Sequence, residues 1–344
     1  MSIIPMIPQS IESESQLDDF MSTPSPELVR DLEGLSGDIM ILGVGGKMGP
    51  TLARMAKRAA PSKRIIAVAR FTTAGLREEL EEYGIETLAC DLLDMQALKN
   101  LPRPENVIFM AGFKFGAQAD PGQTWAMNVQ VPAFVADTFR TSRIVAFSTG
   151  CVYPFATVRE GGSTEDVQPS PPGEYAITCL GRERMFQHYS NVHGTPGVLF
   201  RLNYAIDLRY GVLHDIASNI INDKPIDVSM GHVNIIWQGD ACSQALRCLV
   251  HSSTPPMPIN ISGPEALSVR WLATELGKRL GKKPNIVGEE ADSSWLTNTA
   301  RATQLFGYPT VPVLTMMDWV AEWVSSGRRS FGKPTKFEVT SGTY

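Results

Sequence analysis

The sequence lacks any apolar run close to the roughly 20 residues that a membrane-spanning helix needs. It opens with MSIIPMIPQS, which has no basic stretch ahead of an apolar core, so we expect no secretory signal. Basic residues are not in excess either, because 31 Lys and Arg face 36 Asp and Glu. These absences argue against membrane and nucleic-acid partners, although a small anionic ligand stays compatible with a locally positive site.

Cysteine and histidine are also scarce. The five cysteines are odd in number and never form a CxxC pair, and the five histidines form no HExxH motif. The sequence therefore predicts neither a disulfide framework nor a metal site. Unpaired cysteines are typical of a reducing compartment, so we expect a cytoplasmic protein.

Short apolar runs alternate with amphipathic stretches from residue 38 onward. The runs expected to be strands are 38–42, 64–69, 87–90, 106–111, 143–148 and 197–201, with helices such as 51–59 and 76–83 between them. Continuous apolar runs are typical of strands buried on both faces. The pattern predicts an α/β fold of the Rossmann type, with a doubly wound, mostly parallel sheet.

The ends of the chain and its last third follow other patterns. We expect a flexible arm over residues 1–25 and a short helix over 26–35, together forming an N-terminal segment 1–37. The dinucleotide-binding domain is expected over 38–205, followed by a smaller, discontinuous substrate-binding lobe over 206–328. Short runs at 233–237 and 258–261 and helices at 241–250, 269–280 and 314–325 are assigned to that lobe. The polar tail 329–344 is interpreted as an arm or a lid.

A glycine-rich segment follows the first predicted strand and reads GVGGKMGP over residues 43–50. Gly43, Gly46 and Gly49 give the spacing GxxGxxG, at the junction of a strand and a helix. Glycines there let the backbone approach a pyrophosphate, which the free N–H groups of the helix then bind. We expect this loop to hold a dinucleotide.

The end of the second strand bears on the choice of dinucleotide. An NAD site usually has an acid there, whereas this strand ends in Val68-Ala69-Arg70. Arg70 and Lys47 could pair with a 2′-phosphate, which favours NADP over NAD. Asp91, after the third strand, is expected at the adenine or, alternatively, at a helix N-cap.

Several short motifs then follow in a consistent order. They are Gly43–Gly49, Asp91-Leu92, Met110-Ala111-Gly112, Asn128-Val129, Phe147–Tyr153, Glu174–Thr178, Phe200–Tyr204 and Trp237–Asp240. Together they resemble the extended short-chain dehydrogenases/reductases, the NAD-dependent epimerase/dehydratase family, over about residues 38–328. The resemblance implies cofactor contacts at Gly43, Gly46, Lys47, Met48, Gly49, Arg70, Asp91, Leu92, Ala111, Gly112 and Asn128. It also implies a homodimer.

The same resemblance implies a hydride-transfer site with Thr149 and Tyr175 on the substrate hydroxyl. Tyrosine has an ordinary pKa of about 10, so it needs a nearby cation to act as a base near neutral pH. The family places a lysine four residues after the tyrosine, but this sequence has Cys179 there. Another cation, Lys114 or Arg182, could replace it, the chemistry could run slowly, or the protein could bind NAD(P) without turnover.

The substrate is limited by further departures from the family. Dehydratases carry an acid pair after the Ser/Thr position, and Gly150 and Cys151 stand there. Nucleotide-sugar enzymes commonly place an arginine where this chain has Val233 and Asn234. The sequence therefore favours a small sugar, sugar acid or polyol, with Asn203 and Arg209 as substrate contacts or as loop-fixing residues.

These patterns predict an NAD(P)-dependent oxidoreductase or epimerase that acts on a carbohydrate-like alcohol. The alternative is a catalytically silent NAD(P)-binding module that serves as a redox sensor or assembly partner.

Overall fold

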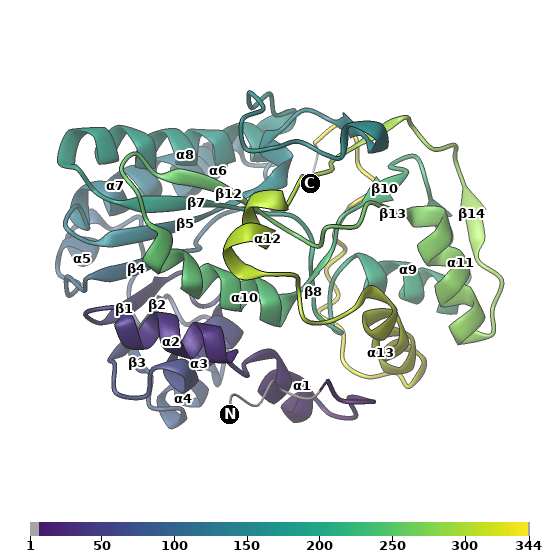
Figure 1. Cartoon of the computed structure of the whole chain (residues 1–344), viewed down its shortest axis with the longest axis horizontal. Helices are drawn as coiled ribbons and strands as arrows, with labels where there is room; N and C mark the ends of the chain where they lie inside the picture. Colours follow the sequence, from purple (N-terminus) through teal and green to yellow (C-terminus); the bar gives the residue numbers. More distant parts are fainter. Residues whose placement is uncertain (1–6, 343–344) are drawn as a thin grey trace.

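The computed structural model describes residues 7–342, and its centre is a parallel sheet of seven strands (Figure 1). In spatial order these are β12 (Met257–Ile261), β7 (Gly197–Leu202), β5 (Arg143–Thr149), β4 (Asn106–Phe109), β1 (Ile39–Leu42), β2 (Ile65–Ala69) and β3 (Glu86–Ala89). In register, Ile39 pairs with Ile65 of β2 and with Asn106 of β4. The order reverses between β1 and β4, so the predicted Rossmann-type sheet is confirmed.

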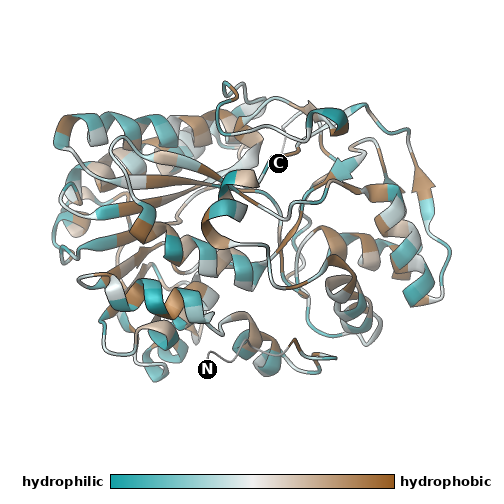
Figure 2. Cartoon of the chain, viewed as in Figure 1, coloured by the Kyte–Doolittle hydropathy of each residue, from teal (hydrophilic) through white to brown (hydrophobic). Residues whose placement is uncertain are grey.

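All six strands predicted in the first 205 residues are present within two residues of their expected ends. Their apolar runs are continuous because both faces of the sheet are covered, as the all-buried pattern of β1, β2 and β4 shows. Figure 2 shows these hydrophobic strands between helices of mixed polarity. Sequence pattern was therefore sufficient to locate six of the seven strands of this sheet.

Helices cover the sheet in two layers (Figure 1). One layer comprises α2 (Pro26–Gly34), α3 (Gly49–Ala59), α4 (Leu76–Glu82) and α10 (Gln238–Arg247). The other comprises α5 (Met95–Lys99), α6 (Pro121–Trp125), the π-helix η1 (Ala126–Gln130), α7 (Val131–Thr138) and α8 (Gly173–His193). The predicted helix 26–35 is confirmed as α2, whose N-terminus is capped by the Ser25 hydroxyl accepting from the Leu28 N–H.

The smaller lobe packs α9 (Val212–Ile221), α11 (Val269–Leu280) and α13 (Val313–Ser325) around its own apolar core. The short strand pairs are β9 (Pro225–Asp227) with β14 (Asn285–Val287), β10 (His232–Val233) with β13 (Leu267–Ser268), β8 (Ala205–Ile206) with β11 (Ile236–Trp237), and β6 (Ala156–Thr157) with β15 (Ser293–Ser294). Single-turn 3₁₀ helices are η2 (Gly150–Val152), η3 (Val158–Glu160) and η4 (Cys248–His251). None of the helices within residues 7–342 combines the length and apolar character needed to span a bilayer.

The chain returns to the sheet after entering the smaller lobe, which corrects two assignments. The run 258–261 was expected in that lobe, but β12 forms the edge of the central sheet beside β7. The predicted helix 241–250 lies against α2 and α3 as α10, and α12 (Ala300–Phe306) packs on β12. A short apolar strand has no period that reveals its partner, so topology could not be assigned from the sequence.

The flexible arm expected over residues 1–25 is wrong for residues 14–21, and its first six residues lie outside the described range. Helix α1 (Glu14–Met21) buries Leu17 and Met21 in the core of the smaller lobe. Ser13 caps it by accepting from the Gln16 N–H. The S-x-x-Q spacing ahead of Leu17 was the signal that could have predicted this helix.

The tail after α13 contacts residues of both lobes. The Phe331 N–H donates to the Arg209 carbonyl, and the Thr335 N–H and hydroxyl both donate to the Asp215 carboxylate at 2.7 and 2.6 Å. Phe337 is buried in the core of the smaller lobe. The tail, which was interpreted as an arm or a lid, is thus fixed at three places.

Candidate active site

The bend after β1 can be made only by glycine at its first position. Gly43 has a φ of +94°, and a Cβ there would come within 2.6 Å of the Ala111 backbone nitrogen. A Cβ at Gly49 would overlap the Val44 carbonyl oxygen. Gly46 differs, because a Cβ there would meet nothing within the protein closer than a carbonyl oxygen at 3.7 Å. No side chain caps the N-terminus of α3 at Met48, so this end of the helix is suited to an anion.

A cavity of about 380 Å³ lies beside this bend, and we call it the glycine-loop cavity. Most of the expected cofactor residues line it together, namely Gly43, Gly46, Arg70, Asp91, Leu92, Ala111 and Gly112. Thr72, Thr73 and, from the tail, Lys333 complete the wall around Arg70. Asp91 accepts from the Leu93 N–H, whereas the N-cap of α5 is Asp94. The glycine-loop cavity thus brings together most of the residues that the sequence assigned to the cofactor.

A second cavity of about 280 Å³ adjoins the first, and Gly46 and Met110 line both. We call it the catalytic cavity. Thr149 enters it from the end of β5, Tyr175 from the first turn of α8, and Lys114 from the loop after β4. The structure therefore brings together the three side chains that the sequence nominated from different segments. The two cavities therefore meet at Gly46 and Met110.

The Tyr175 phenol lies in an environment that favours its neutral form. Burial raises the pKa of Tyr175 well above its ordinary value, and the nearby thiols of Cys179 and Cys151 raise it further. The charge of Arg182 opposes this shift. Burial likewise raises the pKa of the Cys179 thiol, which favours its neutral form. Cys179 therefore supplies no positive charge at the position where the family has a lysine.

Lys114 is the cation that the catalytic cavity places beside the phenol. Its Nζ lies 5.6 Å from the Tyr175 ring centroid and 3.5 Å from the Thr335 carbonyl oxygen of the tail. Burial lowers the pKa of Lys114, which the surrounding thiols partly offset. The side chain therefore pays a desolvation cost to reach this position.

Asn128 and Arg182 form a buried support beneath the cavity. The Arg182 guanidinium donates to the Phe147 carbonyl at 2.7 Å and to the Asn128 Oδ1 at 2.8 Å. Asn128 also accepts from the Phe113 N–H and donates to the Phe113 carbonyl and the Thr178 hydroxyl. Asn128 was expected at the cofactor, but it lines neither cavity and instead fixes the loop that carries Lys114.

Lys47 and Arg209 also lie away from their expected positions. Lys47 lines the catalytic cavity rather than the cavity of Arg70, so the structure does not pair these two cations on one phosphate. Met48 lies beside Lys47 in the same wall. Arg209 is held by Asp207 and Asp18 and does not line the catalytic cavity, which favours the loop-fixing alternative. Side-chain direction in a loop depends on tertiary contacts, which spacing does not encode.

Asn203 lies in the catalytic cavity, as expected for a substrate contact, and donates to the Trp295 carbonyl. The sequence did not identify the tail residues Lys333 and Thr335 or the aromatic wall formed by Phe115, Tyr204 and Tyr210. Apart from Tyr204, which ends the motif Phe200–Tyr204, no motif marks them, because they reach the cleft only through the folded arrangement of the tail and loops.

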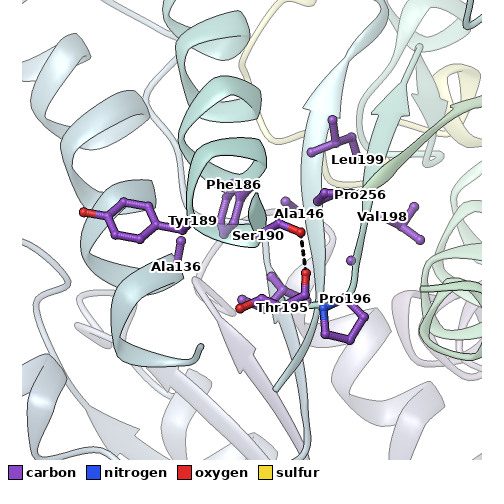
Figure 3. Close-up of a pocket in the computed structure, with 12 residues that line it drawn as sticks. Ala136, Ala146, Phe186, Tyr189, Ser190, Thr195, Pro196, Val198, Leu199 and Pro256 are labelled. Atoms are coloured by element: carbon purple, nitrogen blue, oxygen red, sulfur yellow. Dashed lines mark hydrogen bonds between the residues drawn. The ribbon is translucent and has the colours of Figure 1, made fainter. Parts of the chain in front are cut away.

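A small void elsewhere provides a contrast (Figure 3). It lies where α7 and α8 meet β5 and β7, and it encloses about 10 Å³, enough for at most one water. Figure 3 shows the Ser190 hydroxyl donating to the Thr195 carbonyl beside it. We regard this void as a packing gap.

The strand order and the two adjoining cavities define a Rossmann-type fold with a cleft where the strand order reverses. Residues 39–206, just under half of the chain, match the model of the NAD dependent epimerase/dehydratase family, and this part of the chain is assigned to that family. The resemblance to extended short-chain dehydrogenases/reductases is confirmed. A search of curated protein sequences finds no significant match.

Solved structures of similar fold include UDP-glucuronic acid 4-epimerase from Bacillus cereus in complex with UDP-glucuronic acid and NAD, at a TM-score of 0.69 and 18% identity. That likeness covers 84% of this chain and 99% of the epimerase. UDP-glucose 4-epimerase from Thermus thermophilus in complex with NAD has a TM-score of 0.69 and 15% sequence identity. That likeness covers 83% of this chain and 98% of the epimerase. Pal from Bacillus thuringiensis has a TM-score of 0.70 and 17% sequence identity, and the likeness covers 85% of this chain and 100% of Pal. At these identities the likeness supports the fold alone.

Gly46→Ala tests the glycine loop directly. The free protein has room for the new methyl group, so the free energy of unfolding should change by less than about 0.5 kcal/mol. A methyl group facing the cavity should weaken NAD(P) binding at least about ten-fold, because the pyrophosphate can no longer approach the backbone. Calorimetric titration measures the binding, and Gly34→Ala on α2, where a Cβ meets nothing within 4 Å, is the control. Unchanged affinity would contradict the assignment.

Proposed function

We propose that this protein is an NAD(P)-dependent oxidoreductase or epimerase that acts on a carbohydrate-like alcohol. The observation that carries the proposal is the meeting of Thr149, Tyr175 and Lys114 in a cavity that adjoins the glycine-loop cavity at Gly46 and Met110. Family membership supports the same class of reaction. The solved structures of similar fold include UDP-sugar 4-epimerases in complex with NAD.

Thr149, Tyr175 and Lys114 have different roles in the proposed reaction. When bound, the nicotinamide supplies or accepts a hydride. The Thr149 hydroxyl, at the carboxyl end of β5, positions the substrate oxygen, and the Tyr175 phenol transfers the proton to or from it. Lys114 stabilises negative charge that develops on these oxygens, since a cation in a desolvated cavity acts strongly.

Because the pKa of Tyr175 is raised, ketone reduction and alcohol oxidation differ in how easily they obtain the protonation state of Tyr175 that each needs. A neutral phenol is ready to donate its proton to a carbonyl oxygen that becomes an alkoxide, as ketone reduction requires. Alcohol oxidation needs the phenolate, and Lys114 and Arg182 are the cations that favour it here. We therefore infer that reduction is the easier direction at neutral pH.

The substrate we propose is a small sugar, sugar acid or polyol. No arginine lines the catalytic cavity among the described residues, and two lysines do. We further infer a cytoplasmic homodimer. The five buried free cysteines support a reducing compartment, and exposed Ile177 and Val192 on α8 support an interface along that helix.

Tyr175→Phe tests the mechanism. Loss of the proton-transferring hydroxyl should lower kcat for reduction of sugar-derived ketones by about 100-fold or more while cofactor affinity is retained. Nicotinamide absorbance follows the reduction, and chromatography of the sugars follows epimerisation, which gives no net absorbance change. Tyr189→Phe on the same helix should behave as the unmodified protein. Intact turnover in Tyr175→Phe would overturn the mechanism. If the unmodified protein binds cofactor but turns over no alcohol or carbonyl, the alternative of a catalytically silent NAD(P)-binding module is supported.

The pH profile tests the role of position 179. Because the Tyr175 pKa is raised, the phenolate forms only at high pH, and the rate of alcohol oxidation should keep rising to about pH 10 and beyond. Cys179→Lys introduces a cation on the same helix face and should shift that rise to lower pH. Cys179→Ala, which adds no charge, is the control. Coincident profiles for the two variants would mean that charge at position 179 does not reach the phenol.

We also propose a preference for NADP over NAD, based on Arg70. Arg70 and Lys333 line the glycine-loop cavity beside Thr72 and Thr73, and no acid follows β2. Arg70→Gln should weaken NADP binding about ten-fold and leave NAD binding unchanged, because only NADP carries the 2′-phosphate. Titration with both cofactors measures this, with Arg184→Gln on the exposed face of α8 as control. Equal losses for the two cofactors would contradict the preference.

A further inference from the structure

Lys47, which the resemblance assigns to the cofactor, lines the catalytic cavity. It occupies the fifth position of the glycine loop, and its Nζ lies 3.1 Å from the Tyr210 ring centroid and 4.7 Å from that of Phe115. Lys114 Nζ lies 5.7 Å from the same Phe115 ring. The side-chain nitrogens of two lysines therefore lie near one aromatic ring in the lining of one cavity.

The positive charge of this cavity is not balanced by acidic residues in its lining. Among the described residues that line it there is no Asp or Glu. Asp215 and Asp207 are the nearby carboxylates whose charges act on Lys47, and both are engaged elsewhere. Asp215 accepts two hydrogen bonds from Thr335, and Asp207 is bound by the Arg209 guanidinium.

The protonation of Lys47 agrees with an uncompensated charge. Burial, and after it the positive charges of Lys114 and Lys333, lower its pKa to about 7, although Asp215 and Asp207 partly oppose this shift. Holding cations together away from water costs free energy unless an anion offsets it. An anionic ligand between the lysines would provide that compensation.

We propose that the catalytic cavity recognises an acidic monosaccharide, with Lys47 binding its carboxylate or phosphate group while Thr149 and Tyr175 hold the reacting hydroxyl. This inference rests on the proposed function and deepens it by naming the substrate class. Lys47 is then a specificity-determining residue. The neutral wall of Tyr204, Tyr210 and Asn203 contacts the sugar ring.

Binding to the cofactor-saturated protein tests this inference without turnover. Calorimetric titration with D-glucuronate, D-glucose 6-phosphate and neutral D-glucose separates a carboxylate, a phosphate and an uncharged ring. At least one acidic sugar should bind about ten-fold or more tightly than glucose, since hydrogen bonds to charged groups are the stronger ones. Lys47→Gln should abolish that difference, Lys47→Arg should retain most of it, and Lys99→Gln on the exposed face of α5 should have no effect.

The contrary outcomes are distinct. If neither acid binds more tightly than glucose, or if none of the three sugars binds, the inference is wrong. If Lys47→Gln weakens cofactor binding and leaves the preference for acids intact, Lys47 serves the cofactor pyrophosphate instead. Turnover of neutral sugars alone would uphold the proposed function and overturn only this inference. Selective binding of an acid without any turnover would uphold the inference and overturn the proposed function.

Discussion

The close approach of the Gly43 bend to the backbone at Ala111 is the contact on which the rest of the site depends. It joins the carboxyl ends of β1 and β4, where the strand order reverses, and it leaves no room for a side chain. Because these two ends touch, the glycine loop and the loop carrying Gly112 and Lys114 face one cleft. Parallel α/β sheets bind ligands at this place for the same geometric reason.

A second constraint fixes the floor of the cleft. Arg182 ties β5 to Asn128, and Asn128 ties the loop after β4 to α8. A Cβ at Gly112 would come within 2.5 Å of the Arg182 guanidinium, so this glycine is needed for packing as well as for access. Arg182 lies one helical turn beyond Cys179, where the family has a lysine, and its charge acts to lower the pKa of Tyr175. Lys114 reaches the Tyr175 ring from the loop after β4. The chain thus keeps two cations near Tyr175 without one at position 179.

Much of this arrangement could be predicted from the sequence because the strands are continuous apolar runs with glycine at the turn. Thr149 and Tyr175 could be nominated because they match positions of the family's motifs, and Lys114 because it follows the fourth strand. The side-chain positions of Lys47, Asn128 and Arg209 could not be predicted, because they follow tertiary partners rather than sequence period. The contributions of α1 and the tail could not be foreseen from composition, since polar segments become ordered here through a few buried anchors such as Leu17 and Phe337.

The central claim is that the glycine bend holds a pyrophosphate and thereby directs a nicotinamide toward the Tyr175 phenol. A crystal structure of the protein with bound NADP or NAD tests it most directly. The account predicts the pyrophosphate over Gly46, with the nicotinamide ring in the catalytic cavity and within van der Waals reach of the Tyr175 side chain. An empty glycine loop at saturating cofactor, or a nicotinamide directed away from Tyr175, would contradict the account.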